Sequence, residues 1–167
     1  MARSIIFYPN PILEQKTKDV VFPLDNYIRE VIQDLWTLVA DKGVGMAAPQ
    51  IGESLNICIV NLAEIEEEAK KVKVPNFLMI NPKIVFESQL ECEMVEGCLS
   101  FPDQWYLINR PANIIVEFYD DKGSKKTLKA KEWLSRVIQH EIDHLQGKVF
   151  IKREGAKKLR FEDLEAL

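Results

Sequence analysis

Both histidines of this chain lie in one pentapeptide, His140-Glu-Ile-Asp-His144. The segment around it, from about Ala130, has the apolar periodicity of a helix, and Gly147 is placed to end that helix. Four residues along a helix correspond to roughly 40° of rotation and about 6 Å of rise, so the two imidazoles share a face. At this spacing two histidine nitrogens can ligate one metal ion, with Glu141 beside them to exchange a proton with bound water.

The helix that carries these histidines is amphipathic, and the candidate ligands fall on its apolar side. Trp133 and Val137 precede them on the same face. An imidazole or carboxylate without a partner is costly on a buried face, so each of these groups is expected to have one. The alternative is a polar helical turn without a metal, because a five-residue match of this kind also arises by chance.

A catalytic zinc-type site needs a third protein ligand and one open position. Since the chain has no third histidine, that ligand must be a cysteine or a carboxylate. Cys58 lies in a short run rich in β-branched residues and is expected to be an inert core thiol. Cys98 follows Gly97 in a segment with turn signals and could approach the helix from outside. A carboxylate of the tail, such as Glu162, is the alternative ligand.

The remaining pattern predicts an early helix, several short strands and a late helix. This order indicates an α+β fold, with mostly antiparallel strands around a central helix that carries the His-Glu-x-x-His motif. Residues 64–71 are highly charged and are expected to form a solvated loop or helical turn. A hairpin turn is predicted at residues 120–123. The predicted early helix spans residues 24–40, and the predicted strands span 55–62, 77–80, 113–119 and 126–128.

Composition narrows the classes of function. The chain has 167 residues and is 47% hydrophobic, which suits one domain over residues 1–167. A net charge of −4 and a pI of about 5.3 argue against nucleic acid as a direct ligand. No apolar run approaches the roughly 18 residues of a membrane span. An odd number of cysteines and a short apolar N-terminus predict the reducing cytoplasm of a bacterial-type cell. An organelle reached with a transit peptide is the alternative.

Three segments together resemble the peptide deformylases. They are Gly43-Val-Gly-Met-Ala-Ala-Pro-Gln50, Glu96-Gly-Cys-Leu-Ser100 and Gln139-His-Glu-Ile-Asp-His144-Leu-Gln-Gly147. They occur in the order of that family and at about its spacings, and the resemblance runs from about Ile5 to Arg153. It implies a metal-dependent hydrolase that removes the formyl group from the N-terminal formylmethionine of nascent polypeptides and releases formate.

The resemblance assigns a role to each residue of the motifs. Glu141 would be the general acid and base beside a metal-bound hydroxide that attacks the formyl carbon. The side-chain amide of Gln50 and the backbone N–H of Leu99 would stabilise the oxyanion. The implied metal is Fe²⁺ in the cell, with Zn²⁺, Ni²⁺ or Co²⁺ in purified protein. The implied metal ligands are Cys98, His140 and His144.

The resemblance also implies a binding cleft for the peptide. Small residues in Gly43-x-Gly45 let an extended substrate backbone pass close to the chain, and the family makes such contacts near Val44 and Gly45. A phosphate-binding loop is the alternative for this segment, but the segment lacks the third glycine that such a loop requires. Further substrate-binding residues, around the methionine side chain, would be Met94, Glu96, Gly97, Trp133, Arg136 and Val137.

Two positions depart from the pattern of the family. Arg136 stands where many relatives carry an apolar residue, so its guanidinium must reach solvent or meet an acid. Trp105, expected in a loop, stands where some relatives place arginine. Any substrate contact that this arginine makes is therefore lost here or replaced by aromatic packing.

Two other functions compete with deformylation. A zinc-dependent peptidase would use the same two histidines with Glu162 or Glu165 as third ligand, and Cys98 would then be dispensable. A structural metal module would close the coordination shell with four protein ligands. The expected partners of a deformylase are N-formylmethionyl nascent peptides. A C-terminal helix docks some relatives near the ribosomal exit tunnel, whereas the short tail here favours a solvated terminal helix equally well.

Overall fold

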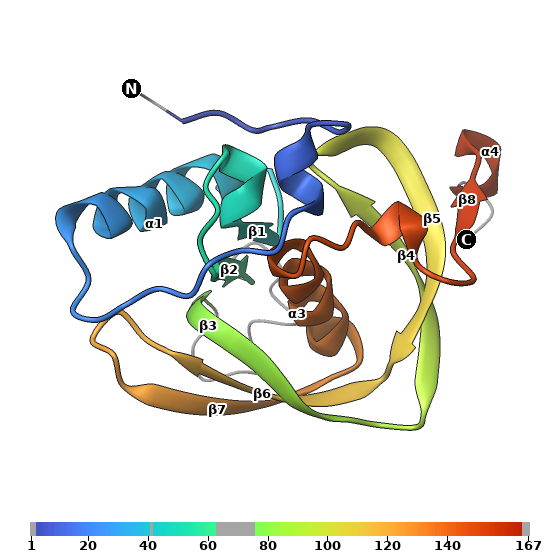
Figure 1. The fold of residues 1–167 in the computed structure, drawn as a ribbon. Helices are drawn as coiled ribbons and strands as arrows, with labels where there is room; N and C mark the ends of the chain where they lie inside the picture. The colour runs from blue at the N-terminus through green and yellow to red at the C-terminus, as the bar shows by residue number, and fades with distance from the viewer. Residues whose placement is uncertain (1–2, 41, 63–75, 165–167) are drawn as a thin grey trace.

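The helix that carries the two histidines, α3 (Glu132–Leu145), runs through the middle of the protein with strands around it (Figure 1). The structure is a computed structural model that describes residues 3–40, 42–62 and 76–164. The span of α3 confirms the helix predicted from about Ala130 to Gly147. Its apolar side chains, among them Leu134 and Ile138, pack into a core cluster with residues of β2 and β6, the strands described below.

The early helix is α1 (Asn26–Val39), in agreement with the prediction for residues 24–40. Its first turn is capped by the side chain of Asp25, which accepts a hydrogen bond from the backbone N–H of Ile28 at 2.8 Å. Val31, Leu35 and Val39 recur at helical spacing and are fully buried in a second core cluster. This burial holds α1 against β1 and β2.

The larger sheet is antiparallel throughout, with strand order β1-β2-β3-β6-β7. The predicted strands at 55–62 and 113–119 are confirmed, whereas those at 77–80 and 126–128 are parts of longer strands. The predicted turn at 120–123 joins β6 to β7, with the Asp120 carboxylate accepting hydrogen bonds from Lys122 and Ser124 N–H groups. The strands are β1 (Gly45–Ala47), β2 (Ile57–Asn61), β3 (Asn76–Glu87), β6 (Asn113–Tyr119) and β7 (Lys125–Lys131).

The smaller sheet, in order β4-β5-β8, was not predicted from the sequence. The prediction of a loop around Trp105 is wrong, because this residue lies on β5. Both long strands, β4 and β5, contain many charged and polar residues, so their intrinsic strand propensity is weak. They form strands because they pair with each other in the sheet. The three strands are β4 (Glu91–Cys98), β5 (Phe101–Pro111) and β8 (Lys157–Leu159).

Short elements complete the fold. The tail ends in α4 (Phe161–Leu164), which has no buried residue and agrees with the prediction of a solvated terminal helix. The charged segment 64–71 lies outside the described residues. The 3-10 turns are η1 (Pro11–Glu14), η2 (Ala48–Ile51) and η3 (Phe150–Lys152).

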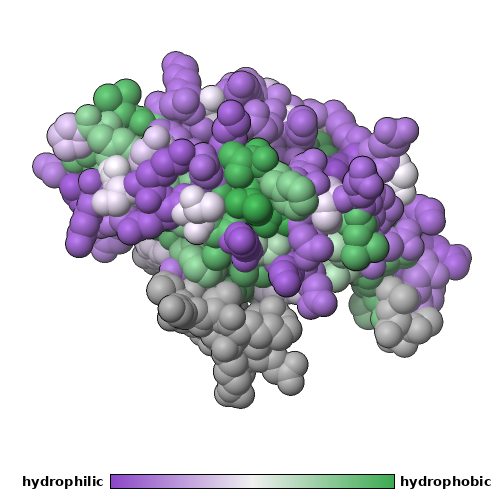
Figure 2. All heavy atoms as spheres, turned by 90° about the horizontal axis from the view of Figure 1, so that it is seen from below, coloured by the Kyte–Doolittle hydropathy of each residue, from purple (hydrophilic) through white to green (hydrophobic). Residues whose placement is uncertain are grey.

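The surface is mostly polar. Figure 2 shows one face on which hydrophilic residues surround a hydrophobic patch near the centre. Among the described residues, the search for a helix long and apolar enough to cross a membrane finds none.

The end of α3 depends on Gly147, and we predict that Gly147→Ala destabilises the protein. Gly147 has φ +70°, and an added Cβ would fall under 3.0 Å from backbone atoms of Glu14 and Gln15. The left-handed backbone costs a non-glycine residue about 1 kcal/mol, and the clash adds roughly 1–3 kcal/mol. Urea titration gives the free energy of unfolding, and its decrease in the variant measures the backbone cost and the clash together.

Gly155→Ala is the matched control for this prediction. Gly155 has φ +75°, but an added Cβ would meet nothing within 4 Å. This variant should lose only the backbone contribution of about 1 kcal/mol. Equal losses in the two variants would mean that the contact between Gly147 and the η1 segment is unimportant.

Candidate metal centre and its cavity

Three ligand atoms converge where β4 ends beside α3. The Sγ of Cys98 and one ring nitrogen each from His140 and His144 lie within 4.8 Å of one another. The Sγ is 3.4 Å from Nε2 of His144, and the two imidazole centroids are 5.0 Å apart. The predicted set of three ligands is thus brought together in space.

Of the two carboxylate alternatives, Glu162 does not belong to this group. The side chain of Glu162 is 78% exposed on α4 and pairs with Arg160 at 3.8 Å. Glu165 lies outside the described residues. The group of Cys98, His140 and His144 is the one metal-type cluster found within the described residues.

Cys98 reaches the helix because the β4–β5 hairpin is irregular next to it. The register shifts between Glu96 and Cys98, and Cys98 then pairs with Phe101. An irregularity of this kind bends a strand and redirects a side chain, and such bends are common beside functional sites. The turn signals that the sequence shows after Gly97 correspond to this tight end of the hairpin.

The chemistry of these donors fits a divalent transition metal. Burial, assisted by the charges of His140 and Arg110, lowers the pKa of His144 well below its ordinary value, which keeps its imidazole in the neutral form that ligates metals. One thiolate and two imidazoles suit zinc, iron or cobalt, and three protein ligands leave a position open. Two buried atoms, Oε2 of Glu141 and Nδ1 of His144, have no hydrogen-bond partner in the described structure. The residues therefore fit such an ion.

A buried carboxylate, Glu96, orients the first histidine. Its Oε2 lies 2.8 Å from Nδ1 of His140, which leaves the other ring nitrogen free to face Cys98. Arg110 donates two hydrogen bonds to the same carboxylate, at 2.5 and 2.9 Å. Burial raises the pKa of Glu96, but the hydrogen bonds from His140 and Arg110 outweigh it and hold that pKa well below its usual range.

Arg136 meets an acid, which is one of the two outcomes that the sequence predicted for it. Its guanidinium donates to Glu96 at 2.8 Å and to the carbonyl of Ile108 at 2.9 Å. A further hydrogen bond, of 2.5 Å, goes to the carbonyl of Cys92. The side chain is 4% exposed, so its charge is balanced inside the protein rather than by water.

Glu141 is buried beside the ligands without being one of them. Burial is the largest influence on this carboxyl group, and it raises its pKa to about 7, against the opposing charges of His140 and Arg110. A carboxyl group with a pKa near neutrality can both accept and donate a proton. The space that it occupies depends on Gly45, where an added Cβ would fall under 3.0 Å from the Glu141 side chain.

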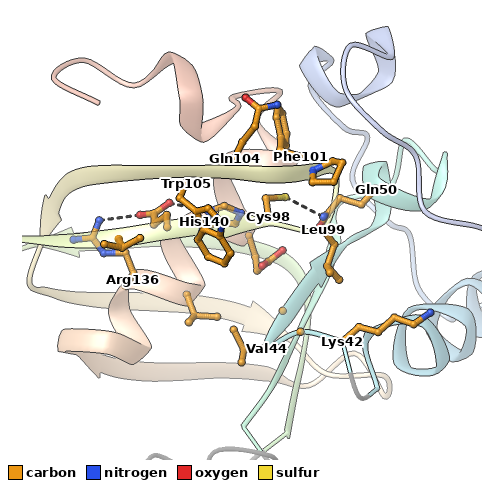
Figure 3. A pocket seen from close by; sticks show the side chains of 18 of the residues that line it. Lys42, Val44, Gln50, Cys98, Leu99, Phe101, Gln104, Trp105, Arg136 and His140 are labelled. Carbon is orange, nitrogen blue, oxygen red and sulfur yellow. Dashed lines mark hydrogen bonds and ion pairs between the residues drawn. The ribbon is translucent and has the colours of Figure 1, made fainter. Parts of the chain in front are cut away.

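The side-chain amide of Gln50, on η2, points toward the metal-ligand group. Its Oε1 accepts a hydrogen bond from the N–H of Ala47 at 2.9 Å, which turns its Nε2 toward the site. Nε2 lies 3.4 Å from Sγ of Cys98 (Figure 3). It also lies 3.3 Å from Oγ of Ser100. Ser100 was not singled out in the sequence, although it ends the Glu-Gly-Cys-Leu-Ser motif. Its hydroxyl helps to place the amide.

A cavity of about 540 Å³ opens over these groups. Side chains from β1, the β4–β5 hairpin and α3 surround it (Figure 3). Met94, which was predicted to bind substrate, lies on β4 and is not among the lining residues. The predicted residues that line it are Val44, Gly45, Gln50, Glu96, Gly97, Cys98, Leu99, Trp133, Arg136, Val137, His140 and Glu141.

Cys58 behaves as a core residue. It is fully buried on β2, and burial raises the pKa of its thiol well above the ordinary value, with the nearby Glu141 adding to the effect. A thiol in this state is a poor nucleophile and ligand. The sequence prediction of an inert core cysteine agrees with this environment.

Comparison with known proteins gives one consistent family. The family model described as polypeptide deformylase matches residues 2–160. The peptide deformylase of Campylobacter jejuni is 36% identical over 164 residues, which cover 97% of this chain and 92% of that protein.

Solved structures of peptide deformylases also resemble this protein in fold. A peptide deformylase from Ehrlichia chaffeensis has a TM-score of 0.81 and 36% identity, and the match covers 99% of this chain and 93% of that one. A class I type b peptide deformylase from Acinetobacter baumannii with Met-Ala-Ser bound has a TM-score of 0.82 and 26% identity, and that match covers 92% of this chain and 98% of the other.

The position of Cys98 predicts that Cys98→Ser loses bound metal, because a hydroxyl group is a far poorer ligand than a thiolate. Metal analysis of anaerobically purified protein measures the metal-to-protein ratio, which should fall from near one toward zero. Cys92→Ser is the matched control, since Cys92 lies on the same strand and its Sγ contacts the Arg136 guanidinium at 3.6 Å rather than the metal-ligand group. A Cys98→Ser protein with the metal content of the control would remove Cys98 from the ligand set.

Proposed function

The chain belongs to the peptide deformylase family and has peptide deformylase activity, and from that premise we propose the roles of its own residues. The observation that carries the proposal is the convergence of Cys98, His140 and His144 beside a buried carboxylate, Glu141, that is not one of the three. The substrates are N-formylmethionyl peptides, and the products are formate and a free amino terminus.

We propose that the three converging side chains hold one divalent ion. Fe²⁺ is the proposed ion in the cell, and Zn²⁺, Ni²⁺ or Co²⁺ can occupy the same ligands in purified protein. When bound, such an ion supplies a Lewis acid that polarises the formyl carbonyl and makes water a better nucleophile near neutral pH. Glu96 keeps His140 aligned for this role through the 2.8 Å contact with Nδ1.

Glu141 is the proposed proton carrier. Its Oε2 has no hydrogen-bond partner in the described structure and can therefore accept the proton of the attacking water. The same carboxyl group then delivers that proton to the departing amine nitrogen, which completes hydrolysis of the amide. A pKa of about 7 suits a group that must take up and release a proton in one cycle.

The oxyanion that forms during attack needs hydrogen-bond donors, and we assign two. Gln50 directs Nε2 at the site, held by its Oε1 contact with Ala47. The backbone N–H of Leu99 is the second donor, from a residue that lines the cavity next to Cys98. Each such donor typically lowers the barrier by about 3 kcal/mol.

The peptide is proposed to bind in extended form between two segments of the cavity wall. Its backbone would run beside Val44 and Gly45 on one side and Gly97 on the other. The methionine side chain would enter the part of the cavity toward α3. The residues proposed to surround it are Glu96, Trp133, Arg136 and Val137, whereas Met94, which does not line the cavity, is left out of this set. The relative from Acinetobacter baumannii has Met-Ala-Ser bound, which supports a peptide as the ligand of this chain.

We also propose that the chain forms one catalytic domain over residues 1–167 and acts in the cytoplasm on nascent peptides. Lys157 and Lys158 on β8, with Arg160 after them, are a candidate contact for the ribosome near its exit tunnel. The side chains of Lys157 and Arg160 are 69% and 78% exposed, as a docking contact requires. Co-sedimentation with ribosomes tests this contact.

The direct test of the proposal is formate release from formyl-Met-Ala-Ser by protein loaded with Fe²⁺ under anaerobic conditions. Metal-dependent release of formate with the tripeptide left intact is the expected result. Cleavage of an internal amide without formate would instead identify a peptidase.

We predict that Glu141→Ala keeps its metal and loses catalysis. Glu141 moves protons without ligating, so metal content should equal that of the unmodified protein. General acid–base catalysis contributes roughly 10²–10⁴-fold to kcat, and a fall of at least this size is expected. Metal analysis and formate release on the same sample separate the two properties. If the variant instead lost its metal, Glu141 would be a structural residue of the site.

For Gln50 the prediction concerns which kinetic constant changes. The charge that its amide stabilises develops only after attack, so Gln50→Ala should lower kcat by roughly 10²–10³-fold and leave KM nearly unchanged. Steady-state kinetics on formyl-Met-Ala-Ser gives both constants. A higher KM with normal kcat would show that Gln50 holds the peptide in the ground state.

A further inference from the structure

The N-terminal segment, residues 3–8, joins two elements that belong to different sheets. It passes as an extended chain over η2, which follows β1 of the larger sheet, toward the β4–β5 hairpin of the smaller one (Figure 1). The backbone N–H of Ile6 donates to the carbonyl of Gln50 at 2.7 Å, and that of Tyr8 donates to the carbonyl of Ser100 at 2.9 Å. One short segment therefore holds η2 and the hairpin together.

The two hydrogen bonds come from alternate residues of the N-terminal segment. In an extended chain the N–H groups of alternate residues point to the same side and are separated by about 7 Å along the chain. The backbone of the segment therefore sets the distance between the carbonyl groups of Gln50 and Ser100. The two donors proposed for the oxyanion are Gln50 and Leu99, the residue before Ser100. They lie in the two elements that the segment joins.

Side chains anchor the N-terminal segment at both of its ends. At the start, the guanidinium of Arg3 donates to Asp34 on α1 at 2.7 Å and to Glu53, which follows η2, at 2.6 Å. At the other end, the ring of Tyr8 stacks on the buried ring of Phe101, with the centroids 4.9 Å apart. A segment held at both ends resists sliding, so its two N–H groups keep their positions.

The stabilisation of an oxyanion depends on where its donors lie. A donor must come within about 3 Å of the developing charge, and a misplacement of about 1 Å can lower a rate by up to roughly 10²-fold. The side chain of Gln50 is fixed to its own backbone region, because its Oε1 accepts a hydrogen bond from the N–H of Ala47 at 2.9 Å. A shift of η2 would therefore move the amide of Gln50 with it.

We propose that Ile6 is a positioning residue, whose backbone N–H fixes η2 relative to the hairpin and so sets the distance between the two oxyanion donors. This inference rests on the proposed function. Ile6 does not line the cavity and is not in the metal-ligand group, so it acts through Gln50. Because the charge on the oxyanion develops only after attack, loss of this hydrogen bond lowers kcat and leaves KM nearly unchanged.

The experiment removes the N–H of Ile6 and keeps two matched controls. Ile6→Pro lacks the N–H but keeps an apolar side chain. Ile6→Ala keeps the N–H and shortens the side chain. Phe7→Pro places a proline at the next position, which is exposed and whose N–H donates no hydrogen bond within the described residues. Each variant is made alone and together with Gln50→Ala. Metal content is measured for each protein, and formate release from formyl-Met-Ala-Ser with Fe²⁺-loaded protein gives kcat and KM.

Ile6→Pro should lower kcat by roughly 10- to 100-fold, with KM and metal content unchanged. The controls Ile6→Ala and Phe7→Pro should keep kcat close to that of the unmodified protein. In the Gln50→Ala background, Ile6→Pro should change kcat by less than about 2-fold, because the group that Ile6 positions is then absent. This lack of additivity distinguishes positioning of Gln50 from a general loss of structure.

The inference is overturned if Ile6→Pro keeps its kcat, if its loss of kcat is the same in the Gln50→Ala background, or if its metal content falls in parallel. An equal loss of kcat in Ile6→Ala or Phe7→Pro would also overturn it, because side-chain packing or stiffening of the chain would then be the cause. If Ile6→Pro does not fold, Arg3→Ala, which releases the first anchor of the segment, is judged by the same criteria. A normal kcat in Gln50→Ala alone would instead count against the proposed function, on which this inference rests.

Discussion

A single buried carboxylate joins the smaller sheet to the helix that carries the histidines. Glu96 on β4 contacts Arg110 on β5 as well as Arg136 and His140 on α3, and it is only 5% exposed. Burying charges costs several kcal/mol each, and well-formed pairs at best recover that cost. The network therefore contributes little net stability. Its main effect is to orient side chains, because each charged group fixes the position of its partner.

The network of ion pairs continues to the C-terminal end of α3, where it holds the part of the helix that carries His144. Arg110 also donates to Asp143 at 2.6 Å, and Arg153, after η3, donates to the same carboxylate at 2.9 Å. Asp143 precedes His144 in the chain, so one guanidinium bridges the carboxylate that holds His140 and the carboxylate beside His144. The spacing of the histidine pair is thereby supported by strands and tail as well as by the helix itself.

The sequence predicts the parts of this arrangement that repeat locally and misses the parts that depend on distant partners. α1, β2, β6 and α3 have clear apolar periodicity, and each was predicted within a few residues. β4 and β5 were missed because residues that face inward on them, such as Glu96 and Arg110, are charged. Their partners lie 14 to 44 positions away in the chain, so no local pattern reveals that they are buried. Cys98 was an open choice from spacing alone, and only the resemblance to a family decided for it.

The β4–β5 hairpin contributes to both the metal-ligand group and the cavity wall, through different residues. Cys98 lies at the closed end of the hairpin, where the register shift and the contact with Gln50 restrict it. Trp105 lies on β5 four residues beyond Phe101, the partner of Cys98, and its ring lies close to Gly97 of β4. The Trp105 ring lines the cavity, and it can lie there because Gly97 has no side chain. The hairpin thus positions a metal ligand through its register shift and shapes the cavity wall through a glycine, while Glu96 of the same strand aligns His140.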